Sequence, residues 1–160
     1  FVDGVLGSKE AVSMIDTAVE TITSFDGKVF YTQDTHGEDY LDTEEGRHLP
    51  VVHCIKGSQG WKIHPKIEKA LLLKDATGIE KSTFGSEKLM GIIEKEVPDV
   101  ESITLIGICT DICVISNAML AKAHFQNTPV TVISSACAGV TPESHENALA
   151  AMKMCHIEIQ

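Results

Sequence analysis

Basic residues are scarce in this sequence of 160 residues. Lys and Arg together number 13 against 23 Asp and Glu, which gives a formal charge of −10. A negative field of this size repels phosphate backbones and anionic lipid headgroups. We therefore expect neither a nucleic-acid partner nor a membrane partner.

Long apolar runs and paired cysteine motifs are also missing. No run approaches the roughly 20 residues that a helix needs to cross a bilayer, and no charged-then-apolar leader opens the sequence. The five cysteines are never spaced as Cys-x-x-Cys, so neither a thioredoxin motif nor a zinc ribbon is present. We expect reduced thiols in a cytoplasmic protein, mostly buried as small apolar residues.

The apolar pattern predicts alternating strands and helices in one domain over 1–160. Hydrophobic residues make up 43% of the chain, enough to build a core. Strands are expected at 28–33, 77–81, 102–108, 130–134 and 155–159, and helices at 8–24, 86–96, 111–126 and 142–154. Residues 34–65 break the pattern and are expected to form a long functional loop. This order is typical of an α/β fold, a doubly wound parallel sheet with helices on both faces.

The segment 107–114, Gly-Ile-Cys-Thr-Asp-Ile-Cys-Val, is the richest in chemistry. An apolar strand runs into a tight turn and then a helix, whose first turn would hold Cys113. The unpaired N–H groups and the dipole of a helix start stabilise a thiolate. The alternative is that Cys113 is an ordinary buried residue, and Cys109 in the same turn is more simply explained by packing. Cys54, Cys137 and Cys155 are interpreted as structural.

Asp34-x-His36 follows the first expected strand, and His53 lies further along the same loop. One carboxylate and two imidazoles can bind a Zn²⁺-like ion and leave positions open for water or substrate. A further ligand could come from between them, where Glu44, Glu45 and His48 lie. The alternative is a simple turn with two surface histidines.

Lys81 ends a weak expected strand. A lysine at a strand end near a cysteine would favour the thiolate, but on sequence alone a solvated surface lysine is the more common case. The other histidines show no partner pattern, so surface or helix-packing roles are expected for them: His64, His124, His145 and His156.

Together and in this order, these segments resemble the isochorismatase-like cysteine hydrolase superfamily, on its nicotinamidase/pyrazinamidase side. The resemblance covers essentially the whole chain, and its most specific part is the turn 107–114. The other matching segments are Phe1-Val2-Asp3-Gly4, Thr32-Gln33-Asp34-Thr35-His36, Pro50-Val51-Val52-His53-Cys54, Lys81 with Phe84-Gly85, and 138–145.

The resemblance implies roles for these residues. Cys113 would be the nucleophile and Lys81 its electrostatic partner, and the Ile108–Cys109 peptide bond would be cis. The backbone N–H groups of Cys109 and Cys113 would then form an oxyanion hole. The implied ligands of a divalent ion (Zn²⁺, Fe²⁺ or Mn²⁺) are Asp34, His36 and His53, with Glu45 as a less certain fourth.

The resemblance also implies a six-stranded sheet, and two departures from the family follow. The family's first strand and its catalytic aspartate match positions ahead of Phe1, so we expect the sequence to lack both. The aromatic residue that stacks on a pyridine ring is replaced by Pro50, which follows Leu49. Phe1, Phe84 or Trp61 could compensate.

The function implied by the resemblance is hydrolysis of nicotinamide to nicotinate and ammonia through a thioester on Cys113, a step of NAD metabolism. One alternative is a related cysteine hydrolase of another small amide, a ureido compound or an isochorismate-type vinyl ether. A catalytically inactive binding protein is a further alternative. A homo-oligomer is expected by analogy with relatives.

Overall fold

The computed structural model describes the whole chain except Phe1 and Asp3. Its helices are α1 (Lys9–Ser13), α2 (Ile15–Ser24), α3 (Glu44–His48), α4 (Pro65–Leu73), α5 (Glu87–Glu96), α6 (Ile115–His124) and α7 (Pro142–Met154). Its strands are β1 (Phe30–Asp34), β2 (Thr77–Lys81), β3 (Ile103–Ile108), β4 (Val130–Ala138) and β5 (Glu158–Ile159). Short 3-10 turns lie at Tyr40–Asp42 and Gln59–Trp61, and a π-helical turn, η3, spans Thr110–Val114.

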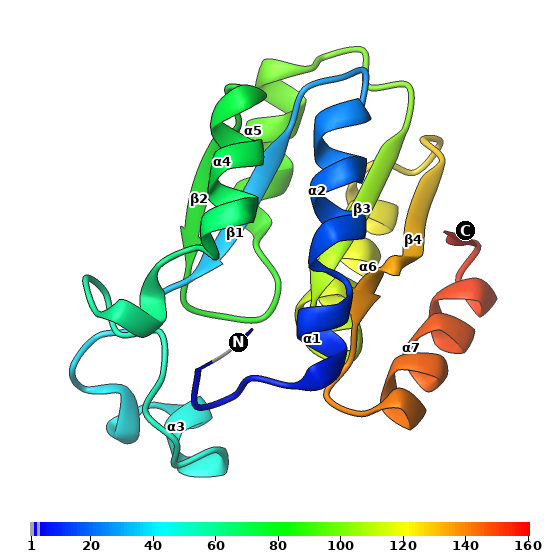
Figure 1. The fold of residues 1–160 in the computed structure, drawn as a ribbon. Helices are drawn as coiled ribbons and strands as arrows, with labels where there is room; N and C mark the ends of the chain where they lie inside the picture. Colours follow the sequence, from blue (N-terminus) through cyan, green and yellow to red (C-terminus); the bar gives the residue numbers. More distant parts are fainter. Residues whose placement is uncertain (1, 3) are drawn as a thin grey trace.

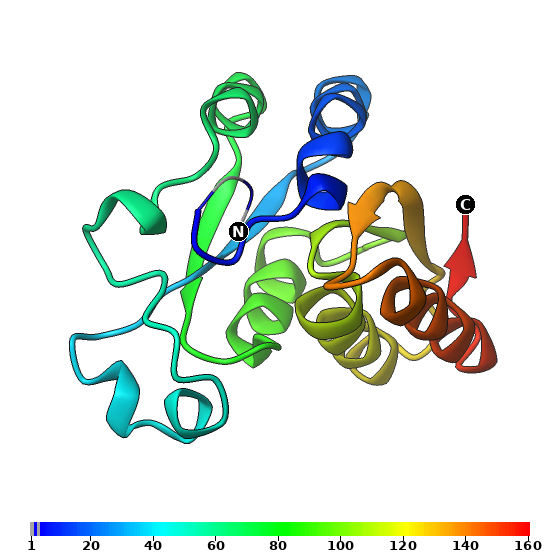
Figure 2. The same ribbon diagram turned by 60° about the horizontal axis from the view of Figure 1, so that its bottom comes forward.

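The strands pair in parallel, with helices on both faces, which confirms the expected fold class. β1 pairs with β2, and β3 with β4 and then β5. Figure 1 shows α2 and α4 in front of the strands, and Figure 2 shows α5, α6 and α7 on the opposite face. None of the helices in the described part of the chain has the length and apolar surface that a bilayer crossing requires.

The described strands form two sheets, and the first strand of the six-stranded sheet that the resemblance implied is matched to positions ahead of Phe1. One sheet has the order β1-β2 and the other β3-β4-β5. Every residue of β1 and β3 is only half-buried, whereas β4 has five fully buried residues. In these two sheets β1 and β3 are each paired along one edge, and no described strand pairs with the other edge of either.

Several element boundaries differ from the expected ones. The helix expected over 8–24 is interrupted at Met14, where the Ser13 hydroxyl donates to the Glu10 carbonyl and competes with the helical bond. Residues 111–126 begin as a π-helical turn, and the last strand is only two residues long. Helix α4 was not expected at all.

The main core lies between β3, β4 and the helices α5, α6 and α7, and it includes Ile93, Val132 and Met152. A smaller cluster joins Ile22 of α2 to Leu71 of α4. These clusters fix the strands from both faces. As a result the carboxyl ends of β1, β2 and β3 lie at one edge, where sites form in parallel sheets.

Candidate active site

Three strand ends bring Asp34, Lys81 and Cys113 together. Asp34 is the last residue of β1 and lies opposite Lys81, the last residue of β2. The Lys81 Nζ atom lies 3.1 Å from Asp34 Oδ1 and 3.5 Å from Cys113 Sγ. Lys81 is only 8% exposed, so the surface role that the sequence alone favoured is wrong.

The charges of this group are interdependent. Burial lowers the pKa of Lys81, but the Cys113 sulfur and the Asp34 carboxylate outweigh burial and raise the pKa overall. Lys81 is therefore a fixed cation. Burial and, to a smaller extent, the Asp34 carboxylate raise the pKa of the Cys113 thiol, and the Lys81 ammonium and a hydrogen bond from the Cys109 backbone offset only part of that rise. Both opposing contacts stabilise a negative charge on the sulfur.

Cys113 lies within the π-helical turn η3, which begins directly after β3. The Cys109 carbonyl accepts hydrogen bonds from the backbone N–H groups of Ile112 and Val114, at 3.1 and 3.0 Å. The Ile108–Cys109 peptide bond is cis, and this is the bond at which the resemblance implies a cis peptide. The turn thus directs the backbone of Cys109 toward the Cys113 sulfur.

Helix α7 and the chain just before it anchor this turn from outside. Thr110 is fully buried, and its hydroxyl shares a 2.8 Å hydrogen bond with His145 Nδ1. The Asp111 carboxylate accepts from the backbone N–H of Val140. His145 therefore has a defined partner, which its sequence context did not indicate.

The proposed metal ligands also converge. Asp34, His36, Glu45 and His53 each offer a ligand atom, and these atoms all lie within 4.8 Å of one another. His36 Nε2 lies 3.3 Å from Asp34 Oδ2 and 3.8 Å from Glu45 Oε1. His53 Nε2 lies 3.7 Å and 3.5 Å from the same two oxygens.

These separations fit a tetrahedral zinc site. Ligands at about 2.1 Å from a central ion lie about 3.4 Å from one another. His36 Nε2 is buried and has no hydrogen-bond partner among the described residues. His53 Nδ1 lies 2.7 Å from the Val51 carbonyl, which orients the ring with Nε2 toward the carboxylates. A hydrogen bond of this kind fixes the tautomer of a ligating histidine.

Tyr40 supports both histidines and was not singled out in the sequence. Its ring is fully buried, and the centre of the ring lies 4.8 Å from the centre of the His36 ring and 4.9 Å from that of the His53 ring. Its hydroxyl donates to the Leu49 carbonyl.

The structure also shows which of the three candidate fourth ligands lies near the other proposed metal ligands. Glu45 faces the histidines. Glu44 and His48 are instead exposed on α3, where Glu44 pairs with both Arg47 and His48.

The expected substrate-binding residues are spread around this edge. Trp61 is half-buried, and its Nε1 donates to Thr35, which lies between two of the metal-binding candidates. Phe84 is 45% exposed and Leu49 37% exposed. Phe1 lies outside the described residues. Their roles in substrate binding remain predictions.

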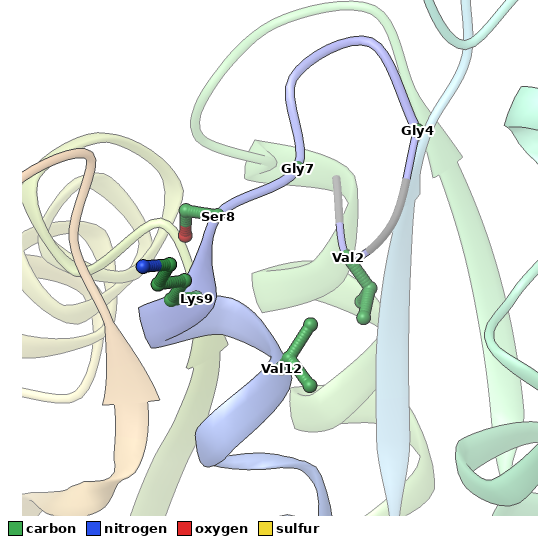
Figure 3. Close-up of a pocket in the computed structure, with 6 residues that line it drawn as sticks. All are labelled: Val2, Gly4, Gly7, Ser8, Lys9 and Val12. Carbon is green, nitrogen blue, oxygen red and sulfur yellow. The ribbon is translucent and has the colours of Figure 1, made fainter.

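The remaining cysteines are unpaired thiols. Cys54 and Cys137 are buried, as expected, whereas Cys155 is exposed because it follows the last residue of α7. A separate open pocket lies at the start of α1, and the described residues that line it include none of the candidate site residues (Figure 3). It is lined by Val2, Gly4, Gly7, Ser8, Lys9 and Val12.

Comparison with known proteins places the chain in a family. The model of the isochorismatase domain matches residues 1–159. The chain therefore belongs to the isochorismatase family of hydrolases. No curated protein matches the chain in sequence.

Solved structures of similar fold are nicotinamidases and pyrazinamidases. The zinc complex of the Pyrococcus horikoshii pyrazinamidase is 25% identical with a TM-score of 0.81, and the match covers 100% of this chain and 91% of that one. The Bacillus subtilis nicotinamidase/pyrazinamidase is also 25% identical with a TM-score of 0.81, covering 96% and 87%. A Streptococcus mutans pyrazinamidase/nicotinamidase is 24% identical with a TM-score of 0.84, covering 99% and 92%.

Proposed function

We propose that this protein is a metal-assisted cysteine amidohydrolase that converts nicotinamide to nicotinate and ammonia. The observation that carries the proposal is the contact of Lys81 Nζ with both Asp34 and Cys113, directly beside a group of four potential metal ligands. Asp34 belongs to both halves, since Oδ1 faces Lys81 and Oδ2 faces the histidines.

In the proposed reaction Cys113 attacks as a thiolate that Lys81 stabilises. The sulfur forms a bond to the amide carbon, the C–N bond breaks, and the nitrogen leaves as ammonia with the proton that the thiol gave up. Water then cleaves the thioester, which releases the carboxylic acid and returns the thiol. The backbone N–H groups of Cys109 and Cys113 are the proposed donors to the oxygen that becomes negative in each step.

Asp34, His36, Glu45 and His53 are the residues that would hold a divalent ion. When bound, such an ion supplies a Lewis acid that can hold a ring nitrogen or a water near the reacting carbon. Asp34 orients this half of the site relative to Lys81, because its two oxygens face the two halves.

Ammonia release from nicotinamide tests the proposal. Wild-type protein, Cys113→Ala and Cys155→Ala are compared; Cys155 is an exposed thiol and serves as the matched control. Activity is expected in wild type and Cys155→Ala and absent in Cys113→Ala. Equal ammonia release from all three would remove Cys113 as the nucleophile.

A second candidate is hydrolysis of another small amide, a ureido compound or an isochorismate-type vinyl ether. The observation that favours it is the pair Leu49-Pro50 at the position where a ring-stacking aromatic residue is expected, with the Leu49 side chain partly exposed. Metal content separates an amidase from a hydrolase of an isochorismate-type vinyl ether, since the resemblance implies that isochorismatases lack the ion. Stoichiometric metal that is lost in His36→Ala would favour the amidase.

A further inference from the structure

Asn117 is a buried amide in the first turn of α6, four residues after Cys113 in the chain. It is only 5% exposed, and its neighbours in the helix, Val114, Ala118 and Ala121, belong to the apolar core. Burying an amide is unfavourable unless its polar atoms are paired. The partners of this side chain therefore explain why it occupies a core position.

All three partners of Asn117 are main-chain groups, and they belong to two separate segments. Its Nδ2 group donates to the Cys113 carbonyl at 2.8 Å and to the Phe84 carbonyl at 3.1 Å. Its Oδ1 atom accepts from the Ser86 backbone N–H at 3.0 Å. The side chain thus links the turn that carries Cys113 to the segment 82–86.

The segment 82–86 begins directly after Lys81. Its far end is Ser86, the N-cap of α5, whose hydroxyl accepts from the Leu89 N–H. Lys81 itself is fixed on its other side by the pairing of β2 with β1. The position of Lys81 is therefore determined by the pairing of its strand with β1 and by the Asn117 hydrogen bonds to the segment that follows it.

The packing of Gly85 is an independent sign that this segment lies tightly on α6. A Cβ atom at Gly85 would lie 2.7 Å from Leu120 Cδ1 and 3.5 Å from Ser116 Cβ. A side chain at this position would require either the Leu120 side chain or the segment itself to shift. The close approach of Gly85 and the two hydrogen bonds that link Phe84 and Ser86 to Asn117 thus act on the same segment.

We infer that Asn117 is a positioning residue that sets the separation of Lys81 Nζ and Cys113 Sγ, and so the reactivity of the sulfur. The inference deepens the proposed function and rests on it for the identity of the nucleophile. Asn117 acts through the two main-chain segments that carry these side chains. Its own amide is fully used by the three main-chain contacts.

Two substitutions distinguish the hydrogen bonds of Asn117 to Phe84 and Ser86 from its hydrogen bond to Cys113. Asn117→Ser keeps a hydroxyl that can donate to the carbonyl four residues earlier, at Cys113, but it loses the bonds to Phe84 and Ser86. Asn117→Ala loses all three. The matched control is Ile93→Val, which removes one methyl group from the core face of α5 and none of the Asn117 hydrogen bonds.

The test measures the rate at which iodoacetamide alkylates Cys113 at a fixed pH, together with kcat and KM for nicotinamide and the melting temperature. Both Asn117 variants are expected to lower the alkylation rate and kcat about tenfold or more, since a 1 Å misplacement can cost about a hundredfold. KM should stay within about twofold, because no substrate contact is removed. Ile93→Val should lower the melting temperature only.

Alkylation needs no nicotinamide, so it tests the role of Asn117 even if the proposed substrate is wrong. A wild-type protein that is alkylated at Cys113 but inactive on nicotinamide would overturn only the proposed function. An alkylation rate in Asn117→Ser equal to that of wild type would overturn the inference. Failure of both variants to fold would assign Asn117 to stability alone and would also overturn it.

Discussion

The two halves of the site are held by different kinds of contact. The four metal-binding candidates all come from residues 34–53, and their supports are nearby in the chain: the Tyr40 ring and the Val51 carbonyl. The turn 109–114 depends instead on distant parts of the chain, since Lys81 comes from β2, His145 comes from α7, and Asn117 links the turn to Phe84. Local spacing therefore builds one half, and packing of the whole fold builds the other.

This difference has a consequence for mutations. A substitution in the metal-binding loop should act mainly on ion binding and leave the core intact, because the loop contributes little to the main apolar cluster. A substitution at the supports of the turn should affect stability and reactivity together. The following predictions test that division, from the largest expected effect to the smallest.

Removal of the Lys81 charge should have the largest effect. Lys81→Met keeps the aliphatic stem but loses the ammonium between Asp34 and Cys113, so kcat/KM for nicotinamide should fall by about 10²-fold or more. Steady-state kinetics measures this. Lys56→Met is the control, since Lys56 is exposed and pairs with Glu80 at the surface; a loss of similar size there would contradict the assignment.

Removal of His36 should abolish tight metal binding without unfolding the protein. His36→Ala removes a buried ligand atom from the centre of the group, so zinc measured by atomic emission after dialysis should fall from stoichiometric to substoichiometric. His48→Ala should keep its zinc, because His48 is exposed on α3. If both variants kept stoichiometric zinc, the four residues would not be the metal site.

Loss of the Thr110 hydroxyl should destabilise the fold moderately. Thr110→Val leaves His145 Nδ1 without its buried partner, and the free energy of unfolding should fall by about 1–3 kcal/mol. Urea denaturation measures the change. The same substitution at the exposed Thr83 is the control and should lower the free energy of unfolding less, because the hydrogen bond from its hydroxyl to the Gly85 carbonyl is exposed. Equal values for the two variants would show that His145 does not support the turn.

Alkaline pH should produce the smallest effect. Burial raises the pKa of Cys137 to about 11, above the value of about 8.5 for an exposed thiol. Between these values the unfolded chain loses the thiol proton while the folded chain keeps it, so stability present below about pH 8.5 is lost as the pH rises toward 11. Urea denaturation at pH 8 and pH 10.5 should show a smaller loss for Cys137→Ala than for wild type. The buried Cys54 leaves part of the effect in both.

The elements that were predicted well from the sequence carry local signals. Strand β2 and helix α7 have the expected bounds, and the Thr141-Pro142 start of α7 forms a capping box with Ser144. Helix α4 was missed although Ile67, Ala70 and Leu71 have helical spacing, because Leu72 and Leu73 extend the apolar run beyond that stripe. Leu71 is buried, but Leu72 and Leu73 are 75% and 70% exposed.

The candidate site shows the same division. The spacing of Asp34, His36 and His53 within one loop was enough to suggest a metal site, and the structure brings them together. The sequence alone could not place Lys81 in the interior, because its burial depends on β1 and on the turn after β3. Asn117 carried one weak signal, a polar residue on an otherwise apolar helix face, and its partners are known only from the fold.

The separate pairing of the two sheets has a consequence for assembly. The edges of β1 and β3 that face away from their partners carry rows of N–H and C=O groups that no described strand pairs. A single strand placed between these two edges would satisfy both rows and join the two sheets into one. The strand ends that carry Asp34 and Lys81 would then belong to one continuous sheet.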